Sequence, residues 1–391
     1  MSRAREFVSR FRGRDTGSLP VIVGLLVIWG VFQTLNPTFL SSTNLVNLTM
    51  QSAAVGTMSI GVVLVLLLGE IDISVGSVSG LASAIFAVGY VQLGLPTPVM
   101  VGAALATGAL VGLIFGLLRT RFGVPSFIIT LAGLLAVLGL QLAVLGRTGS
   151  INIPFDSWIV QFGQQWFLPA WVSYSLVVAS VGLFAWLRIS LSRRRDAAGL
   201  SSTSTTMILV RSAALLIVLL LAVWYLGLSR GVGAMFALFV LLAVVMHFFL
   251  TRTRWGRSVY AVGGSVEAAR RAGIPVNRVY ISVFMLCSMF AALGGIMAAA
   301  RLAAANQGSG GADTNLNAIA AAVIGGTSLF GGRGSAFSAV LGILVIMSIT
   351  SGLTLINPDS SIRYIITGVV LLLAVVIDSL SRRSRAAAGR A

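Results

Sequence analysis

The sequence predicts an all-α membrane protein, a polytopic helical bundle of about twelve spans in which one or two helices are broken or re-entrant. Hydrophobic residues occupy 57% of its 391 positions and charged residues only 9%, far from the proportions of a soluble domain. Apolar runs of about twenty residues, each long enough to cross about 30 Å of hydrocarbon as a helix, recur along the chain. Because these runs lack the period-two alternation of barrel strands, they indicate helices.

The apolar runs predict the spans in chain order. We place them at 19–36, 45–68, 73–93, 98–118, 126–146, 170–190, 207–228, 233–251, 278–300, 315–331, 335–356 and 362–380. Together they are expected to form a single transmembrane domain, residues 19–380, between a basic tail at 1–18 and another at 381–391. A cleaved signal peptide is not expected, because the first run lacks a small-residue cleavage site and leads directly into further spans.

The arginines predict the orientation, because basic residues are enriched in cytoplasmic loops. With both termini in the cytoplasm, twelve crossings place most of the arginines on that side, namely those of both tails, Arg119, Arg121, residues 193–195, the loop 252–277 and Arg333. The exceptions, which then lie outside, are Arg147, Arg230, Arg301 and Arg363. We therefore expect a multi-pass membrane protein with both termini in the cytoplasm.

The formal net charge of +17 does not indicate a nucleic-acid partner, because topology and contact with anionic membrane lipid already explain dispersed loop arginines. All 27 basic residues are arginine, so the chain has neither a P-loop lysine nor a lysine for Schiff-base chemistry. Cys287 and His247 are each the only residue of their type, which excludes a disulfide and a Cys/His metal site. We expect His247 to be a packed or interfacial residue, and the chain to carry no enzymatic activity, metal or cofactor.

Two acidic residues, Glu70 and Asp72, interrupt an apolar region in the stretch "LVLLLGEIDISVGSVSG". Ionisable groups at such a place are costly unless they pair or face an aqueous cavity. The glycines and serines that follow, Ser74 and Ser77 among them, indicate a break or re-entrant turn. Two interpretations stand: a role in a translocation path or its gate, and a structural one in which Asp72 is the N-cap of the next helix.

A second broken region is predicted in "AIAAAVIGGTSLFGGRGSAFSAVLG", where Gly325, Gly326, Thr327 and Ser328 begin a glycine-rich stretch. Glycine at this density either permits close helix packing or lets the backbone turn inside the protein as part of a path or gate. A phosphate-binding loop is a weak alternative, because the stretch lies in an apolar span and lacks the preceding strand and the lysine.

The polar stretch "SVEAARRAGIPVNRV" joins two apolar runs. Good helix formers fill positions 266–272, Gly273 is expected to end the helix, and Pro275 prevents it from continuing. The product is a short surface helix, which suits docking into a cleft of a partner protein.

The spacing of Glu267, Ala268, Ala269 and Gly273 resembles the E-A-A-x-x-x-G signature by which permease subunits of ABC importers engage their ATPases. Three further stretches extend the resemblance over most of residues 40–380: "GEIDISVGS", "LNAIAAAVIGGTSLFGGRGS" and "YIITGVVLLLAVVID". Together they resemble the branched permease family of bacterial monosaccharide ABC importers. The added pair of spans at 170–190 and 207–228 is most similar to its xylose-type members. Glu70 departs from the family, which usually has a second glycine there.

The resemblance implies a permease subunit that moves xylose or a related sugar across the bacterial cytoplasmic membrane and breaks no bond itself. It implies three partners: an ATPase that binds ATP and Mg, an extracytoplasmic sugar-binding protein, and a second permease chain in a homodimer or pseudo-dimer. Glu267 would cap the helix or form a salt bridge in the docking cleft, Ala268 and Ala269 would permit close approach, and Gly273 would end the helix. Arg270 and Arg271 would pair with acidic residues of the ATPase.

The alternative function is a secondary transporter driven by an ion gradient, which usually needs ionisable groups within the membrane. Only Glu70 and Asp72 could supply them here. A membrane-embedded enzyme is disfavoured, because the sequence offers no cluster of nucleophile, base or metal ligands. Asp72 is expected to matter more for transport than Glu70, since its pattern fits a helix cap.

Overall fold

The computed structural model describes residues 19–372, apart from 201, 203, 358, 360, 363, 364, 367, 370 and 371. Both predicted tails, 1–18 and 381–391, lie outside the described residues. The helices are α2 (Leu19–Leu35), α3 (Ser42–Leu67), α4 (Val75–Ala87), η1 (Val88–Gln92), α5 (Thr97–Phe122), α6 (Ser126–Leu145), η2 (Gly146–Thr148), α7 (Trp158–Gln164), α8 (Ala170–Ala197), α9 (Thr205–Gly227), α10 (Ala234–Arg252), α11 (Arg254–Gly264), α12 (Val266–Arg271), α13 (Val276–Leu302), α14 (Ala312–Ile324) and α15 (Ala336–Ile356). Two short strands, β1 (Ser150–Asn152) and β2 (Ala304–Asn306), pair antiparallel.

Within the described residues, nine helical segments are long and apolar enough to cross a membrane. They are α3, α4 continued by η1, α5, α6 continued by η2, α8, α9, α10, α13 and α15. α2 is an apolar helix of slightly shorter length. This arrangement confirms the predicted fold class, a polytopic helical membrane protein.

The tenth predicted span, 315–331, is wrong. α14 contains 13 residues and ends at Ile324, which gives about 20 Å of helix, less than the roughly 30 Å of a hydrocarbon core. The helix cannot continue because Gly326 has a φ of +101°, a conformation outside the helical region. The apolar composition of the segment therefore indicated burial correctly and helix length incorrectly. Most of the last predicted span, 362–380, lies outside the described residues.

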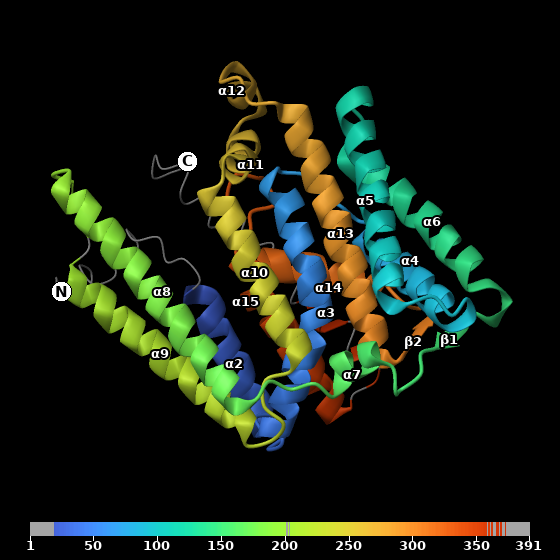
Figure 1. Cartoon of the computed structure of the whole chain (residues 1–391), viewed down its shortest axis with the longest axis horizontal. Helices are drawn as coiled ribbons and strands as arrows, with labels where there is room; N and C mark the ends of the chain where they lie inside the picture. The colour runs from blue at the N-terminus through green and yellow to red at the C-terminus, as the bar shows by residue number, and fades with distance from the viewer. Residues whose placement is uncertain are drawn as a thin grey trace.

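α3 and α13 form the centre of the bundle (Figure 1), and 89% of the apolar window of α3 is buried. α13 packs against α3, α4 and α5. Small residues bring these helices together: a Cβ at Gly108, Gly112 or Gly116 of α5 would collide with atoms of α13. This is the small-residue packing by which helices associate in membranes, where lipid is as apolar as the side chains and close contact drives association.

The bundle has two distinct ends. The β1–β2 pair lies at one end, which we call the strand end, and α11 with α12 lies at the other, which we call the α12 end (Figure 1). Successive helices alternate between the ends, so that Arg119, Arg121 and the loop 252–277 share the α12 end. Arg147 and Arg301 lie at the strand end. This is the relative arrangement that the arginine pattern predicts.

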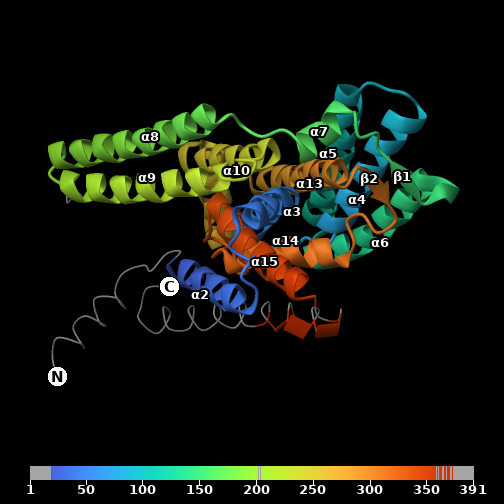
Figure 2. The same cartoon turned by 90° about the horizontal axis from the view of Figure 1, so that it is seen from below.

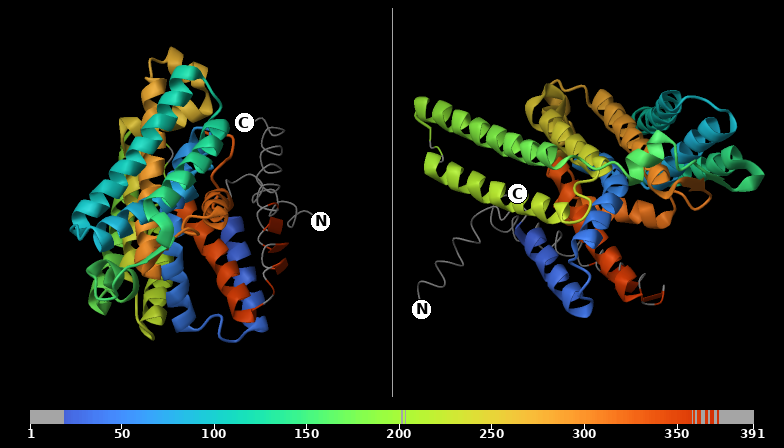
Figure 3. Two further views of the ribbon diagram at one scale, coloured as in Figure 1. Left: turned by 90° about the vertical axis from the view of Figure 1, so that its right-hand side faces the viewer. Right: turned by 60° about the horizontal axis from the view of Figure 1, so that its bottom comes forward.

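α8 and α9 form a peripheral hairpin that projects from the bundle (Figures 2 and 3). Only 11% of the apolar window of each helix is buried, which leaves most of their apolar side chains for lipid. The arginines at 193–195 were expected in a connecting loop, but α8 continues to Ala197 and includes them. The helix extends because nothing in residues 190–197 breaks it, and Gly199, with a φ of +69°, comes just after its end.

Candidate functional site

α12 is the short surface helix that the sequence predicts. The Ser265 hydroxyl caps its start by accepting the Ala268 N–H at 3.3 Å. At its end Gly273 has a φ of +78°, its N–H donates to the Arg270 carbonyl at 3.0 Å, and the Ile274 N–H donates to the Ala269 carbonyl at 3.1 Å. These two bonds form a Schellman motif, in which glycine takes the left-handed position. The predicted role of Gly273 in ending the helix is confirmed.

Two residues of α12 have partners within the chain. Ala269 is only 3% exposed and packs into the core of its own chain, so the close approach that it permits here is between α12 and the bundle. Glu267 does not cap the helix, because Ser265 holds that position. Instead, the Glu267 carboxylate lies 3.5 Å from the Arg271 guanidinium, and both side chains are at least 80% exposed. The open face of α12 therefore carries Glu267, Ala268, Arg270 and Arg271.

α11 fastens α12 to the bundle through its buried face. The Trp255 indole N–H donates to the Ser282 hydroxyl of α13 at 2.8 Å. The Tyr260 hydroxyl donates to the Gly334 carbonyl at 2.8 Å, and burial raises the pKa of this hydroxyl. Val259 and Val262 are fully or almost fully buried between these anchors. α11 therefore contacts both α13 and the second broken region.

α11 ends where the two broken regions meet. Backbones approach closely at five glycines, which we call the glycine junction: Gly69, Gly263, Gly264, Gly331 and Gly332. The Gly332 N–H donates to the Leu67 carbonyl at 2.9 Å. A Cβ at Gly263 would collide with the same Leu67 carbonyl. A Cβ would collide with backbone at Gly263 and Gly331, whereas one at Gly264 would meet no atom within 4 Å. The junction joins the end of α3, the end of α11 and the loop before α15.

Glu70 is held by an ion pair next to the glycine junction. Its carboxylate lies 2.8 Å from Arg119 of α5, with side-chain exposures of 12% for Glu70 and 28% for Arg119. The Arg119 guanidinium also lies 5.3 Å from the ring centroid of Tyr280. Glu70 thus links the break after α3 to α5 and α13, and its charge is balanced within the chain.

Asp72 organises the break between α3 and α4. Its side chain is 2% exposed and accepts the Ser74 N–H at 2.8 Å and the Ser74 hydroxyl at 2.7 Å. The N-cap position of α4 belongs to Ser74, so Asp72 lies two residues before the position predicted for it. The carboxylate nevertheless accepts a backbone N–H at the helix start, as the structural interpretation expected.

The backbone freed by the break finds partners in other helices. The Ile71 N–H donates to Ser126 of α6 at 3.3 Å and the Ile73 N–H donates to Thr130 at 3.1 Å. The Asn315 amide of α14 donates to the Ile73 carbonyl at 2.6 Å. Buried backbone groups need such partners where no water reaches them. The first break therefore rests on α6 and on α14. Ser77 lies further on, buried inside α4.

The glycines of the second broken region both permit close packing and let the backbone turn, while their role in a path or gate stays a prediction. Gly325 packs against the Ser338 backbone of α15, where a Cβ would collide, as close helix packing requires. Gly326 instead has open space around a Cβ and needs glycine for its positive φ. Thr327 is fully buried, and the Ser328 N–H donates to the Arg333 carbonyl at 2.9 Å. The stretch is an irregular turn inside the protein rather than a helix.

A cavity of about 260 Å³ lies toward the strand end, between α3, α4, α13 and the loop from β2 to α14. Its polar lining consists of Ser79, Ser83, Asn306, Ser309 and Thr314. The buried Gln141 side chain holds this loop by donating to the Asn306 and Ser309 carbonyls at 3.1 and 3.0 Å. We call this cavity the strand-end cavity.

The strand-end cavity was not predicted. Of the eight residues expected in a path or gate, namely Glu70, Asp72, Ser74, Ser77, Gly325, Gly326, Thr327 and Ser328, none lines it. They lie nearer the α12 end or within α4. The polar stretch "ANQGSGGADTN" at 305–315 was the available signal, because so polar a segment between apolar runs must find water or internal partners.

The single histidine, His247, and the single cysteine, Cys287, both contact neighbouring side chains of the bundle. A ring nitrogen of His247 lies 3.2 Å from the Ser335 hydroxyl, and its ring packs on Phe337. The Cys287 thiol is buried and contacts the Asp72 carboxylate at 3.6 Å. Among the described residues, no three His, Cys, Asp or Glu side chains group as metal ligands would.

Comparisons with known proteins agree with this arrangement. The family described as "Branched-chain amino acid transport system / permease component" matches residues 44–375. The xylose transport system permease protein XylH of Escherichia coli K12 is 37% identical over 95% of this chain and 95% of its own length. XylH of Haemophilus influenzae is 33% identical over 93% and 96%, and the ribose import permease protein RbsC of E. coli K12 is 32% identical over 92% of each. No solved structure matches the chain significantly.

These matches confirm the predicted class, a transport permease subunit rather than an enzyme. They cover both broken regions, the glycine junction and α12. The chain belongs to the family of permease components of membrane transport systems.

Proposed function

We propose that the chain is the permease subunit of an ATP-driven importer that moves a monosaccharide, xylose or a related sugar, across a bacterial cytoplasmic membrane. The relatives named as xylose and ribose permeases support this, since they align over more than nine tenths of the chain. The strand-end cavity supports it chemically, because its hydroxyl and amide groups suit the hydroxyls of a sugar.

The observation that carries the proposal is the path from α12 to both broken regions. α12 exposes charged side chains at the α12 end, and α11 joins it to the glycine junction. A separate ATPase, which binds ATP and Mg, would dock on α12. Its closure would move α11 and shift the breaks between two arrangements, which is how packed elements transmit small displacements.

The two breaks are proposed as the gate at the α12 end of the path. Asp72 and Ser74 hold one break, and Gly325 to Ser328 form the other. An extracytoplasmic sugar-binding protein would deliver the sugar to the strand-end cavity. A second permease chain, in a homodimer or pseudo-dimer, would complete the pathway.

The ion-coupled alternative is weaker for a structural reason. Glu70 is paired with Arg119 at 2.8 Å, and Asp72 accepts two hydrogen bonds from Ser74. Both carboxylates that such a transporter would use for its coupling ion are therefore engaged in holding the first break.

The test is transport by the reconstituted system. The permease, its ATPase and its binding protein are assembled in proteoliposomes, and uptake of radiolabelled xylose and ribose is measured with ATP and with a non-hydrolysable analogue. We expect uptake of at least one sugar with ATP alone. Uptake by the permease without the ATPase, driven by a proton or sodium gradient, would contradict the proposal.

A further inference from the structure

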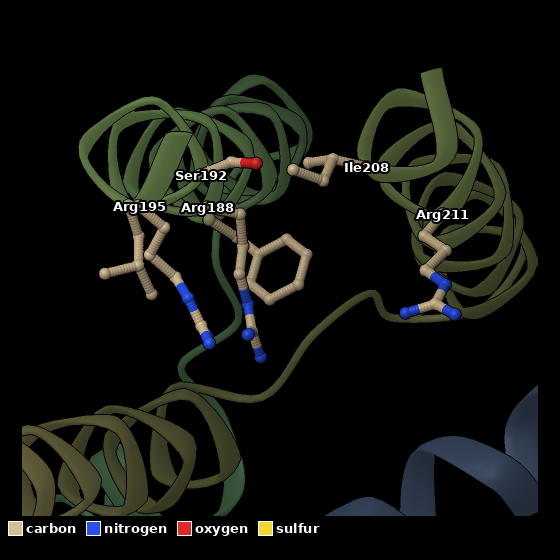
Figure 4. A pocket seen from close by; sticks show the side chains of 7 residues that line it. Arg188, Ser192, Arg195, Ile208 and Arg211 are labelled. Atoms are coloured by element: carbon tan, nitrogen blue, oxygen red, sulfur yellow. The ribbon is translucent and has the colours of Figure 1, made fainter. Parts of the chain in front are cut away.

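The α8–α9 hairpin contains a basic pocket that the transport path does not use. The pocket has a volume of about 140 Å³ and lies between the two helices. Three arginines line it, Arg188 and Arg195 from α8 and Arg211 from α9. Figure 4 shows the three side chains pointing to the same side of the helices. Apolar walls come from Phe184, Leu191 and Ile208.

These arginines have no carboxylate partner within the described part of the chain, where the ion pairs are those of Arg119 with Glu70 and of Arg271 with Glu267. The nearby Asp196 side chain accepts the Ser202 hydroxyl instead. The Arg188 guanidinium lies 5.4 Å from the ring centroid of Phe184, which fixes its direction. Three positively charged side chains thus border one small pocket, and an anion would balance their charge.

The position of the pocket along the hairpin matches a membrane surface. Arg188 lies about 27 Å and Arg195 about 38 Å along α8 from Ala170, and Arg211 lies about 24 Å from Gly227 along α9. The hydrocarbon core is about 30 Å thick. If Ala170 and Gly227 mark the opposite surface, the backbones of Arg211 and Arg188 lie just inside the edge of the hydrocarbon and that of Arg195 lies outside it, so the long side chains of all three can reach the headgroup phosphates.

The rest of the chain leaves the hairpin uncovered along most of its apolar length. Only 11% of each apolar window is buried, and Leu183, Trp186 and Val218 are more than half exposed. At the strand end the hairpin is fastened to the bundle, for example by the Tyr225 hydroxyl that donates to the Leu40 carbonyl at 2.8 Å. Toward its arginine end it leans away from the bundle (Figure 1). Lipid therefore has access to the pocket.

We propose that this pocket binds the phosphate of an anionic glycerophospholipid, such as phosphatidylglycerol, in the leaflet at the α12 end. Arginine forks bind phosphate oxygens through paired hydrogen bonds, and basic pockets between membrane helices bind anionic headgroups. The acyl chains lie along Phe184, Leu191 and Ile208. Zwitterionic phosphatidylethanolamine has the same phosphate but carries an ammonium group, which the three arginines disfavour.

The test compares two charge-matched variants of the full chain. Arg188→Gln/Arg211→Gln removes two pocket charges, whereas Arg193→Gln/Arg194→Gln removes two exposed charges of the same helix end that do not line the pocket. Native mass spectrometry of protein in detergent measures bound phosphatidylglycerol and phosphatidylethanolamine over a range of lipid concentrations. Inorganic phosphate and glycerol phosphate are titrated separately.

The wild-type chain is expected to prefer phosphatidylglycerol, and the pocket variant to lose about thirtyfold in affinity for it, at about fivefold per arginine near a membrane surface. The control variant should retain wild-type affinity.

An equal loss in both variants would mean that the lipid binds to the general charge of this surface rather than to the pocket. Binding of inorganic phosphate as tight as that of the lipid would show a soluble anion site. Either result overturns the proposal. If the double variant aggregates, each single variant gives the same test at about fivefold. Transport is not needed for this measurement, so it stands apart from the proposed function.

Discussion

The Gly332 N–H donates to the Leu67 carbonyl at 2.9 Å, across 265 positions of sequence. This bond joins the end of α3 to the loop before α15, the two places where helices are interrupted. Gly263 of α11 packs on the same carbonyl. The Leu67 carbonyl oxygen therefore contacts the helix that precedes α12 and connects the two breaks, which places it on the proposed route from α12 to the bundle.

Gly263→Ala is expected to disturb this point, and Gly264→Ala is its control. A Cβ at Gly263 would collide with the Leu67 carbonyl, whereas one at Gly264 has no atom within 4 Å. Overpacking of this kind costs about 1–3 kcal/mol, and a neutral surface change stays within about 0.5 kcal/mol. Thermal stability and ATP-driven uptake should both fall for Gly263→Ala alone. Equal behaviour of the two variants would show that the junction does not transmit movement.

The sequence was sufficient for α12 because its signals are local. Gly273 and Pro275 each act within a few residues, so the end of the helix could be predicted without the fold, whereas the Ser265 cap was not predicted although its signal is equally local. The glycine junction could not be found in this way, because Leu67, Gly263 and Gly332 meet only after the helices pack. The span expected at 315–331 failed for a different reason. Apolar composition indicates membrane burial and does not distinguish a helix from an irregular turn with positive φ.

The residues of the candidate site also differ in whether their signals are local in sequence. Asp72 was found because a carboxylate within apolar sequence is conspicuous, and its bond to the Ser74 backbone is local. Ser79 and Ser83 of the strand-end cavity were not assigned a role there, since the sequence alone does not show whether a serine within a helix faces a cavity. Only the folded chain brings them opposite Asn306 and Thr314.

Asp72→Ala is expected to impair transport more than Glu70→Gln. It leaves the buried Ser74 N–H without an acceptor, at about 1–3 kcal/mol, and loosens the start of α4. Glu70→Gln keeps a side-chain oxygen that can accept from the Arg119 guanidinium, and Arg119 keeps 28% of its side chain exposed to solvent, so the smaller effect is expected here. Asp72→Asn keeps an acceptor oxygen and is the matched control. Sugar uptake and thermal stability measure the effect, and loss of uptake in Glu70→Gln with normal uptake in Asp72→Ala would reverse the two roles.

Thr314→Phe should block the strand-end cavity. Thr314 lines it and is partly exposed, so a phenyl ring has space to enter without disrupting the core. Uptake is expected to fall about tenfold or more, equivalent to 1.4 kcal/mol, while association with the ATPase stays unchanged, because the cavity lies far from α12. Leu316→Phe in the same helix is the control, since Leu316 is 49% exposed and does not line the cavity. Unchanged uptake in Thr314→Phe would remove this cavity from the path.

The last prediction concerns the end of α12. Gly273 has a φ of +78° and open space around a Cβ, so the position demands a backbone conformation rather than a small volume. Gly273→Val should cost about 1–2 kcal/mol in that conformation, which corresponds to about a five- to thirtyfold shift away from the native turn. Because the turn sets the direction of Glu267 and Arg270, the variant should remain inserted, yet associate less with the ATPase and lose uptake and stimulated ATP hydrolysis together. Gly273→Asn is the control, since asparagine tolerates the left-handed region, and it should retain most activity. If Gly273→Val is inserted and transports as well as Gly273→Asn, the residues 265–277 are only a connection between α11 and α13.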